Sequence, residues 1–389
     1  MSVPSDPLSE YTHRLQARQA TAGYYAARDR ALANWRLAVA AVALLLGWLA
    51  FLQHALSGWW LLGPAVAFVA LVIRHDSVIR EHRRAERAVR FYREGLRRLE
   101  DRWAGHGNPG ERFLEPEHPY AADLDLFGPG SLFELLCTAR TRAGEETLAA
   151  WLLDGAAPET VRARQEAVAD LRSRLDLREE LALAGEDVRS AVDAEGLVAW
   201  GAAPVQLSGT APRIIAGVLA ALTLAGAVAW ALGQGPVPFL VLLLIEQGYD
   251  QTLRPKVRPI LKALERPARD LELLSQLLAR LEREPFAAPR LRELQAELGH
   301  GGVRASAQVA RLRYLVGLLE AQRNAVFAPL GLVLLWPTQL AFEVEKWRGQ
   351  TGPDLGRWVS AIGELEALSC LAGYAFEHPQ DPFPELADE

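Results

Sequence analysis

The sequence predicts an all-α protein in which membrane-spanning helical hairpins adjoin a helical body. Half of its 389 residues are hydrophobic although 23% are charged, a combination typical of a soluble body joined to membrane segments. The hydrophobic residues concentrate in two stretches that lack Asp, Glu, Lys and Arg, at residues 37–73 and 214–245. Elsewhere apolar residues recur at helical spacing, and neither alternating β-branched runs nor Asn-Gly turns indicate strands.

Residues 1–34 form a polar N-terminal segment, and residues 35–73 form the first predicted transmembrane hairpin. No apolar region follows the start of the chain closely enough to be a cleaved signal peptide. The hairpin divides at "QHALSGWW" into two limbs, each of which approaches the ~20 residues that a membrane-spanning helix needs. The alternative is a buried hairpin of a soluble core, but a soluble helix would carry a polar stripe and these limbs carry none.

The orientation of this hairpin follows from arginine. Arginines precede it at positions 28, 30 and 36 and follow it from Arg74 onward, whereas the connecting loop has neither Lys nor Arg. Because cytosolic flanks carry the excess of basic residues, both ends are expected on the cytosolic side of the inner, cytoplasmic membrane. The lipid bilayer is thus the first predicted partner, and the helical body and both termini are expected in the cytosol.

Residues 74–104 contain a heptad stripe, which predicts one amphipathic stalk helix that ends before "GHGNPG". The stripe consists of Val78, His82, Ala85, Val89, Tyr92, Leu96, Leu99 and Trp103. It either forms a dimeric coiled coil or packs against the chain's own cytosolic domain, and the histidine and alanine in the seam favour the second alternative. The surrounding arginines suit an anionic membrane surface, which is worth about 1 kcal/mol per basic residue.

A linker at 105–122 leads to the first part of the helical body at 123–212. A Gly-Pro-Gly turn precedes Ser131, which is expected to cap the next helix. The apolar face of that helix is expected to consist of Leu132, Leu135, Leu136 and Ala139. Thr138 and Thr141 would lie about one turn apart on it and bond backbone carbonyls.

The second uncharged stretch predicts another hydrophobic hairpin at 213–246. Its first limb, "IIAGVLAALTLAGAVAWAL", is long enough to span a bilayer. Its second limb, which ends before Glu246, is short for a span and fits a buried or re-entrant segment nearly as well. Residues 247–378 form the second part of the body, and residues 379–389 form a C-terminal tail.

The segment "DLDLFGPGSLFELLCTARTRAGEETLAAWLL" resembles the opening of the helical core domain of MutS-type DNA mismatch repair ATPases, and a membrane-attached branch of that family in particular. That opening has a leucine-acid-leucine turn and then a helix with the pattern "T..T..G...L..WL". The matching residues are Asp123, Leu124, Asp125, Leu126, Phe127, Gly128, Thr138, Thr141, Gly144, Leu148, Trp151 and Leu152.

Three further segments continue the resemblance in the same order. "VRARQEAVADL", which contains Arg164 and Gln165, is similar to the family's next element. "RPARDLELLSQLLARLE" resembles a helix of the family's core, and "WVSAIGELEALSCLAGYAFEHP" resembles the helix that leads into the ATPase domain. The resemblance implies a MutS-core-like helical domain at 123–212 and 247–378.

The resemblance also implies an ATPase domain that binds ATP and Mg²⁺, a homodimer, and DNA as a partner. The P-loop of that domain, G-x-x-x-x-G-K-[ST], needs a lysine directly after a glycine. The lysines Lys256, Lys262 and Lys346 follow no glycine, so this polypeptide alone is expected neither to bind ATP nor to be an enzyme. The family reads mismatches with a Phe-x-Glu motif near the N-terminus. Phe113–Glu115 has the letters of this motif but lies in a Pro-rich linker, so it is not expected to have this role. The net charge of −6 provides no basic field for DNA.

No catalytic or metal site is predicted from the residues themselves. The eight histidines form no i,i+4 ligand pair. Cys137 and Cys370 lie far apart in the sequence, have no zinc spacing, and are expected to be reduced cytosolic thiols without a pairing pattern. Asp123 and Asp125 are expected to cap the turn or to be solvated.

Two functions fit these observations. The first is a membrane-anchored MutS-like core that couples an ATPase domain to DNA or a protein partner in DNA repair or recombination. The second is a membrane scaffold whose helical body recruits partners without nucleotide or DNA. A transporter fits less well because the apolar stretches lack intramembrane charges. A P-loop encoded within a hundred or so codons beyond Glu389 would favour the first function.

Overall fold

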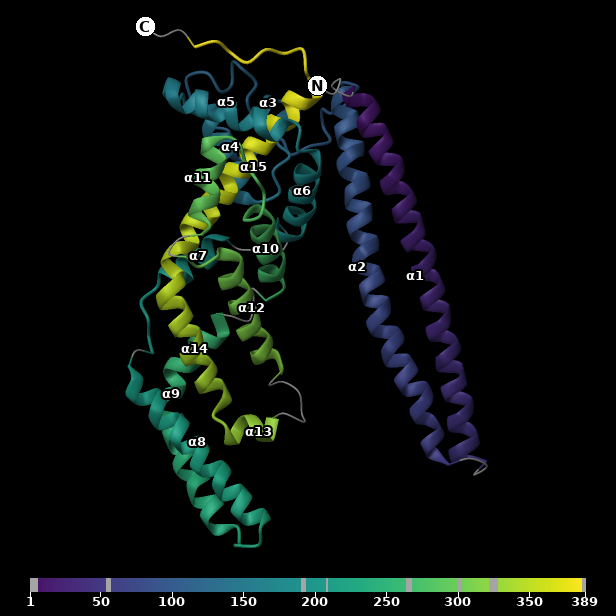
Figure 1. Cartoon of the computed structure of the whole chain (residues 1–389), viewed down its shortest axis with the longest axis vertical. Helices are drawn as coiled ribbons and strands as arrows, with labels where there is room; N and C mark the ends of the chain where they lie inside the picture. Colours follow the sequence, from purple (N-terminus) through teal and green to yellow (C-terminus); the bar gives the residue numbers. More distant parts are fainter. Residues whose placement is uncertain are drawn as a thin grey trace. The chain divides into compact units, whose positions relative to one another are not determined.

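The computed structural model describes residues 6–53, 57–189, 194–207, 209–263, 268–299, 302–321 and 328–386. Within these residues every regular element is a helix, which confirms the predicted all-α class (Figure 1). The chain divides into two compact units. The first consists of Met1–Leu114, Ala122–Leu135 and Tyr374–Pro382, and the second of Glu115–Ala121, Leu136–Gly373 and Phe383–Glu389.

The main element of the first unit is a long antiparallel hairpin of α1, Pro7–Phe51, and α2, Leu62–Leu99, which lie side by side (Figure 1). The Asp6 carboxylate accepts a hydrogen bond from the Ser9 N–H at 3.2 Å and caps α1. The 3₁₀ turn η1, Gly58–Leu61, precedes α2. Each long helix is continuous across the boundary between its polar part and its uncharged part.

The polar N-terminal segment is the partner of the predicted stalk, a role that the sequence reasoning missed. From Pro7 onward it belongs to α1, which packs along the heptad stripe of α2. In that stripe Val78, Ala85, Val89 and Tyr92 are at most 8% exposed. The stripe is therefore covered within one chain, by α1 rather than by the cytosolic domain that the intramolecular alternative named, and its buried residues are not free for a dimeric coiled coil.

The helix α2 ends at Leu99, before the predicted boundary at 104. Asp101 has a φ of 55°, which lies outside the range of a right-handed helix, so the chain leaves the helix axis there. Trp103 consequently lies beyond the helix, whereas the rest of the stripe remains on it.

The end of α15, Leu355–Glu377, joins this hairpin inside the first unit. The Glu377 carboxylate, only 1% exposed, accepts hydrogen bonds from the Arg98 guanidinium at 2.8 and 2.6 Å and from the Tyr11 hydroxyl at 3.1 Å. The Tyr11 ring also lies 5.4 Å from the ring of Phe376. One ion pair and two aromatic rings thus hold α1, α2 and the last turn of α15 together.

The rest of the first unit is a turn with an aromatic core. The 3₁₀ helix η2, Glu111–Phe113, and the short helix α3, Leu132–Leu136, flank it. The rings of Phe113, Phe127 and Phe133 meet at centroid distances of 5.4 to 5.8 Å. Phe113 therefore packs into this core.

The second unit is a bundle of helices in which α10 packs against α6 and α12, α14 packs against α9 and α12, and α5 packs against α11 (Figure 1). Its helices are α4 Arg142–Leu153, α5 Pro158–Arg172, α6 Leu175–Arg189, α7 Ala194–Ala202, α8 Thr210–Ala231, α9 Val237–Ala263, α10 Ala268–Leu281, α11 Pro289–Glu297, α12 Ala305–Ala321, α13 Ala328–Val333, α14 Trp336–Thr351, the 3₁₀ helix η4 Gly352–Asp354, and most of α15. The core residues include Leu171, Leu177, Leu278, Leu281, Leu291, Leu312, Trp347, Leu365 and Leu368, all at most 2% exposed.

The second hydrophobic stretch forms a helical hairpin, as predicted for residues 213–246. Its limbs are α8 and the first part of α9, which lie side by side (Figure 1). Gly233 and Gly235 turn the chain between them with φ of 91° and 85°, values that L side chains rarely adopt. The helix α9 runs on to Ala263, well past the predicted limit of the hairpin.

Four helical segments in the described residues are long and apolar enough to cross a membrane: Pro7–Phe51, Trp59–Leu99, Thr210–Ala231 and Trp336–Glu377. In the most apolar window of each, the buried shares are 6%, 11%, 22% and 61%. The fourth segment, which comprises α14 and α15, is therefore part of the protein core. The other three present apolar side chains outward, and they belong to the two predicted hairpins.

Candidate functional site

The turn that carries the first half of the family resemblance is structural. Leu126 and Phe127 are buried, whereas Leu124 is 61% exposed. The N–H groups of Leu132 and Phe133 donate to the carbonyls of Asp125 and Leu126, both at 3.0 Å, so the turn folds back on the start of α3. Asp123 and Asp125 are exposed, in line with their expected solvated role. Among the described residues, no group of three or more His, Cys, Asp and Glu side chains could hold a metal ion.

The segment after this turn is two helices rather than the one that the sequence predicted. Ser131 does cap α3, since its hydroxyl accepts from the Glu134 N–H at 3.2 Å. However, α3 ends at Leu136, and its fully buried side chain is Phe133, whereas Leu132 is 38% exposed. The threonines therefore do not lie on that helix. Residues 137–141 form a non-helical connector to α4, because partners on α15 bind their polar groups.

Thr141 is the N-cap of α4 and the centre of a buried contact with α15. Its hydroxyl accepts from the Gly144 N–H at 3.1 Å and donates to the Glu366 carboxylate. That carboxylate also accepts from the backbone N–H groups of Arg140 at 3.2 Å and Thr141 at 3.1 Å. Burial raises the pKa of Glu366 above its ordinary value, although these donors oppose the shift.

Two glycines allow α4 and α15 to approach this closely. A Cβ atom on Gly144 would lie 2.3 Å from Oε2 of Glu366, and a Cβ atom on Gly363 would lie 2.8 Å from the carbonyl oxygen of Ala143. Neither distance leaves room for a side chain. The family-pattern glycine is thus explained by helix packing, and its counterpart on α15 was not recognised from the sequence.

The remaining pattern residues also pair. The Arg164 guanidinium stacks on the Trp151 ring at 3.8 Å, a cation–π contact between α4 and α5. The side-chain amide of Gln165 donates to the Pro384 carbonyl at 2.9 Å. Arg164 and Gln165 are neighbours in the sequence, so α5 contacts both α4 and the C-terminal segment of the second unit.

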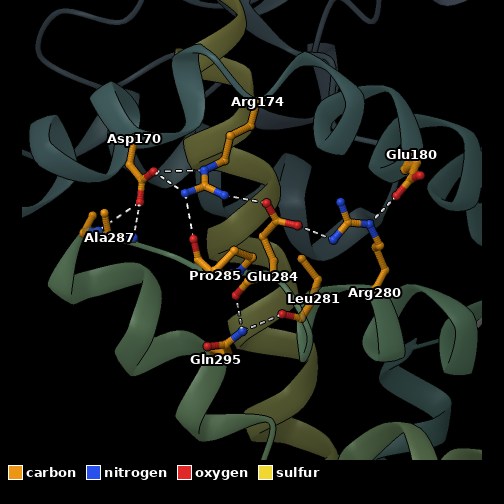
Figure 2. Close-up of polar contacts among 10 residues, drawn as sticks. Asp170, Arg174, Glu180, Arg280, Leu281, Glu284, Pro285, Ala287 and Gln295 are labelled. Carbon is orange, nitrogen blue, oxygen red and sulfur yellow. Dashed lines mark hydrogen bonds and ion pairs between the residues drawn. The ribbon is translucent and has the colours of Figure 1, made fainter.

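A chain of charged side chains joins α5 and α6 to α10 and α11 (Figure 2). Asp170 accepts from the Arg174 guanidinium at 2.8 and 2.9 Å. Arg174 also donates to Glu284 at 2.5 Å. Glu284 accepts in turn from Arg280, which bonds Glu180 at 2.5 Å. Both arginines in this cluster are bonded to carboxylates, so the cluster is a structural link between these helices.

Asp170 of this cluster also bonds the backbone at the start of α11. Its second oxygen accepts from the backbone N–H groups of Ala287 at 2.7 Å and Ala288 at 2.9 Å, directly before α11 (Figure 2). Burial would raise the pKa of Asp170, but these two N–H groups and the Arg174 guanidinium hold it below its ordinary value. Asp170 is therefore a charged acceptor that positions the start of α11.

The second unit has an open groove of about 620 Å³ between α11 and α15, lined by Arg290, Glu293, Ala296, Glu297 and Arg357. Arg290 donates two hydrogen bonds to Glu364, both at 2.7 Å, and one to Glu293 at 3.0 Å. Arg357 lies 3.4 Å from Asp354. Because carboxylates neutralise both arginines, the groove has no geometry specific for phosphate.

The apolar flanks of the two hairpins carry most of the exposed large hydrophobic side chains and are candidate functional surfaces. Exposed positions of the first hairpin include Leu44 at 76% and Trp59 at 78%, and those of the second include Leu232 at 76% and Leu244 at 73%. Apolar surface of this extent is characteristic of membrane or protein contact.

Polar contacts mark where each apolar flank ends. At the first hairpin His75 lies between Asp29, at 2.6 Å from Nε2, and Arg36, at 2.8 Å from Nδ1. At the second, Arg213 at the start of α8 pairs with Glu343 on α14, and the Thr338 hydroxyl donates to Asp250 at 2.7 Å.

No family model, no curated protein and no solved structure matches the chain. The likeness to MutS-type proteins therefore depends on the residues of this sequence alone.

Proposed function

We propose that this chain is a membrane-anchored, MutS-like helical core. In this proposal two helical hairpins attach the chain to the cytoplasmic membrane, and the helical body in the cytosol couples a nucleotide-driven ATPase domain to DNA or a protein partner in DNA repair or recombination. ATP and Mg²⁺ belong to that ATPase domain and not to this polypeptide.

The observation that carries the proposal is the contact between the segments that resemble the family. Thr141 of the first segment bonds Glu366 of the fourth, at a separation of 225 positions. Trp151 of the first segment stacks on Arg164 of the second. Segments that resemble the family thus contact one another through α4, α5 and α15, which is what a shared core requires. This supports the family proposal over an arbitrary set of helices.

Membrane attachment is supported by the exposed apolar flanks and by the distribution of charge. The polar contacts at the open end of each hairpin and the uncharged turns at the other end fit two crossings per hairpin. Because two crossings return the chain to the same side, the helices before and after α8–α9 would share one compartment. The packing of α6 against α10 within one unit supports such an arrangement.

Cysteine labelling tests this topology. In a variant without native cysteines, Ser57→Cys, Gln234→Cys and Glu389→Cys are introduced singly, and intact cells receive an impermeant maleimide. Labelling is expected at positions 57 and 234, and at 389 only after permeabilisation. Labelling of 389 in intact cells would refute the proposed orientation. Labelling of 57 without 234 would show that the second hairpin does not reach the far side.

Deletion of residues 37–73 tests whether the first hairpin is the main anchor. Most of the protein is expected in the soluble fraction after carbonate extraction if α8–α9 inserts only in part. Retention of the deleted form in the pellet would show that the second hairpin anchors the chain by itself.

DNA binding separates this proposal from a membrane scaffold, its alternative. The full chain in nanodiscs is titrated into fluorescent homoduplex, mismatched and branched DNA, and the anisotropy is measured at several salt concentrations. The core proposal with DNA as partner expects a structure-dependent affinity tighter than the ~10⁻⁴–10⁻⁶ M of non-specific binding. Equal, weak binding of all three DNAs would favour the scaffold or a protein partner.

A further inference from the structure

The two cysteines of the chain are neighbours in space. Cys137 lies in the connector before α4, and Cys370 lies on α15; both are free thiols. Thr138, which directly follows Cys137, bonds the sulfur of Cys370: its backbone N–H donates at 3.3 Å and its hydroxyl at 3.4 Å. The Cys137 and Cys370 thiols therefore lie near each other. From the sequence the two thiols were expected to have no pairing pattern, and the fold brings them close together.

We propose that Cys137 and Cys370 form a reversible redox site, in which a peroxide or a disulfide oxidant converts the two thiols into an intramolecular disulfide. The closeness of the two thiols makes each cysteine the first available partner of the other. A transient disulfide is the usual form of such a bond in a cytosolic protein, where thiols are otherwise kept reduced. The proposal is independent of the family resemblance and of any nucleotide or DNA role.

The two sulfurs differ in access and in environment. Cys137 is partly exposed, whereas Cys370 is only 1% exposed, so an oxidant from solvent reaches Cys137 first. Burial raises the pKa of the Cys370 thiol, but its interactions with Cys137 and with the N–H and hydroxyl of Thr138 hold the pKa below its ordinary value. The interaction with Cys370 and burial raise the pKa of Cys137. Access to solvent therefore makes Cys137 the sulfur that is oxidised, and the lowered pKa makes Cys370 the nucleophile that resolves it.

The reaction with hydrogen peroxide balances in two steps. The Cys137 sulfur attacks one peroxide oxygen, the O–O bond breaks, and the departing hydroxide takes the thiol proton and leaves as water. Cys137 is then a sulfenic acid. The Cys370 sulfur attacks the Cys137 sulfur, the S–O bond breaks, and the hydroxide leaves with the Cys370 proton as a second water. The two thiols lose two electrons and two protons, and the peroxide is reduced to two water molecules.

The disulfide would tie the connector before α4 covalently to α15. This is the junction at which Thr141 bonds Glu366 and at which Gly144 and Gly363 allow close helix packing. Oxidation would therefore hold α4 and α15 together by a covalent bond. After reduction, only hydrogen bonds and packing would hold this junction.

Thiol counting tests the proposal. The full chain in detergent, at a dilution that disfavours contacts between chains, is treated with hydrogen peroxide and then denatured in a maleimide mass tag. The wild type is expected to lose both free thiols, to stay monomeric on a non-reducing gel, and to yield one linked peptide pair by mass spectrometry. Dithiothreitol is expected to restore both thiols.

The two single variants separate the roles of the sulfurs. In Cys370→Ser, Cys137 has no resolving partner, so a dimedone adduct of its sulfenic acid is expected. In Cys137→Ser, the buried Cys370 thiol is expected to survive the same treatment. Circular dichroism of both variants establishes that they are folded. Retention of both thiols in the wild type, or disulfides only between chains, would overturn the proposal; so would oxidation of Cys370 in Cys137→Ser at the wild-type rate.

Discussion

Replacement of Gly363 by alanine tests the close packing of α4 on α15. A Cβ atom at this position would lie 2.8 Å from the carbonyl oxygen and 2.9 Å from the carbonyl carbon of Ala143, where ordinary contact begins at 3.4 Å. The obstacle is helix backbone, which no side-chain rotation can remove. The α4 helix must therefore shift by about half an ångström, and overpacking of this kind costs about 1–3 kcal/mol.

The helix propensity of alanine opposes this cost and must be separated from it. Glycine to alanine in a helix interior stabilises by about 1 kcal/mol. Gly317 in α12 supplies the matched control, because a Cβ atom there has nothing within 4 Å. The propensity term is common to Gly363→Ala and Gly317→Ala, so the difference between the two variants isolates the steric term, expected at about 1–3 kcal/mol.

Thermal unfolding of the full chain in one detergent, followed by circular dichroism, measures this difference. For a unit of this size about 1 kcal/mol corresponds to a change of about 2–4 °C in Tm. Gly317→Ala is expected to melt slightly above the wild type and Gly363→Ala below it. If both variants melt above the wild type by the same amount, the contact between α4 and α15 has room for a Cβ atom and carries no steric cost.

Three further outcomes are expected. Arg98→Met leaves the Glu377 carboxylate, 1% exposed, without its charged partner and should lower the free energy of unfolding in denaturant by about 3–5 kcal/mol. Adding Glu377→Gln should recover most of this loss. No recovery would show that the ion pair is not the cause. The folded pKa of Asp170 lies below its ordinary 3.8, so its contribution is complete above pH 3.8 and is lost as the pH falls through the folded pKa. Wild type should therefore lose stability more steeply than Asp170→Asn below pH 3.8, and parallel acid-denaturation curves would contradict this. Thr141→Val removes the N-cap of α4 and should lower the free energy of unfolding by about 1 kcal/mol. Thr147→Val is the control and should cost less, because the Thr147 hydroxyl bonds the Ala143 carbonyl within α4. Equal losses in the two variants would exclude a capping role for Thr141.

Much of the architecture could be predicted because its signals are local. The uncharged stretches at 37–73 and 214–245 predicted two helical hairpins, since a long apolar run without charge leaves few other structures. The heptad stripe of α2 predicted a helix with one buried face, and Ser131 predicted a helix start. In each case the residues that determine the outcome lie within a few turns of one another.

The candidate site was predicted only in part. The pattern residues Thr141, Gly144 and Trp151 were identified as structural, but their partners Glu366, Gly363 and Arg164 were not assigned to them. The sequence also placed the threonines on a single helix that is capped by Ser131. The local helix propensity of these residues allows that helix. Contacts with α15 interrupt it, because the buried carboxylate of Glu366 accepts hydrogen bonds from backbone N–H groups of the connector.

The sequence by itself determined which segments are helical, which faces are apolar and where charge is absent. Only the tertiary structure decided what covers each face: α1 on the stripe of α2, α15 on the start of α4, and one cysteine beside the other. The physical reason is that spacing within a segment defines the surface that must be buried, whereas the choice among partners depends on packing and hydrogen bonding between residues hundreds of positions apart. Cys137 and Cys370 show this most directly, since nothing near either residue indicates the other.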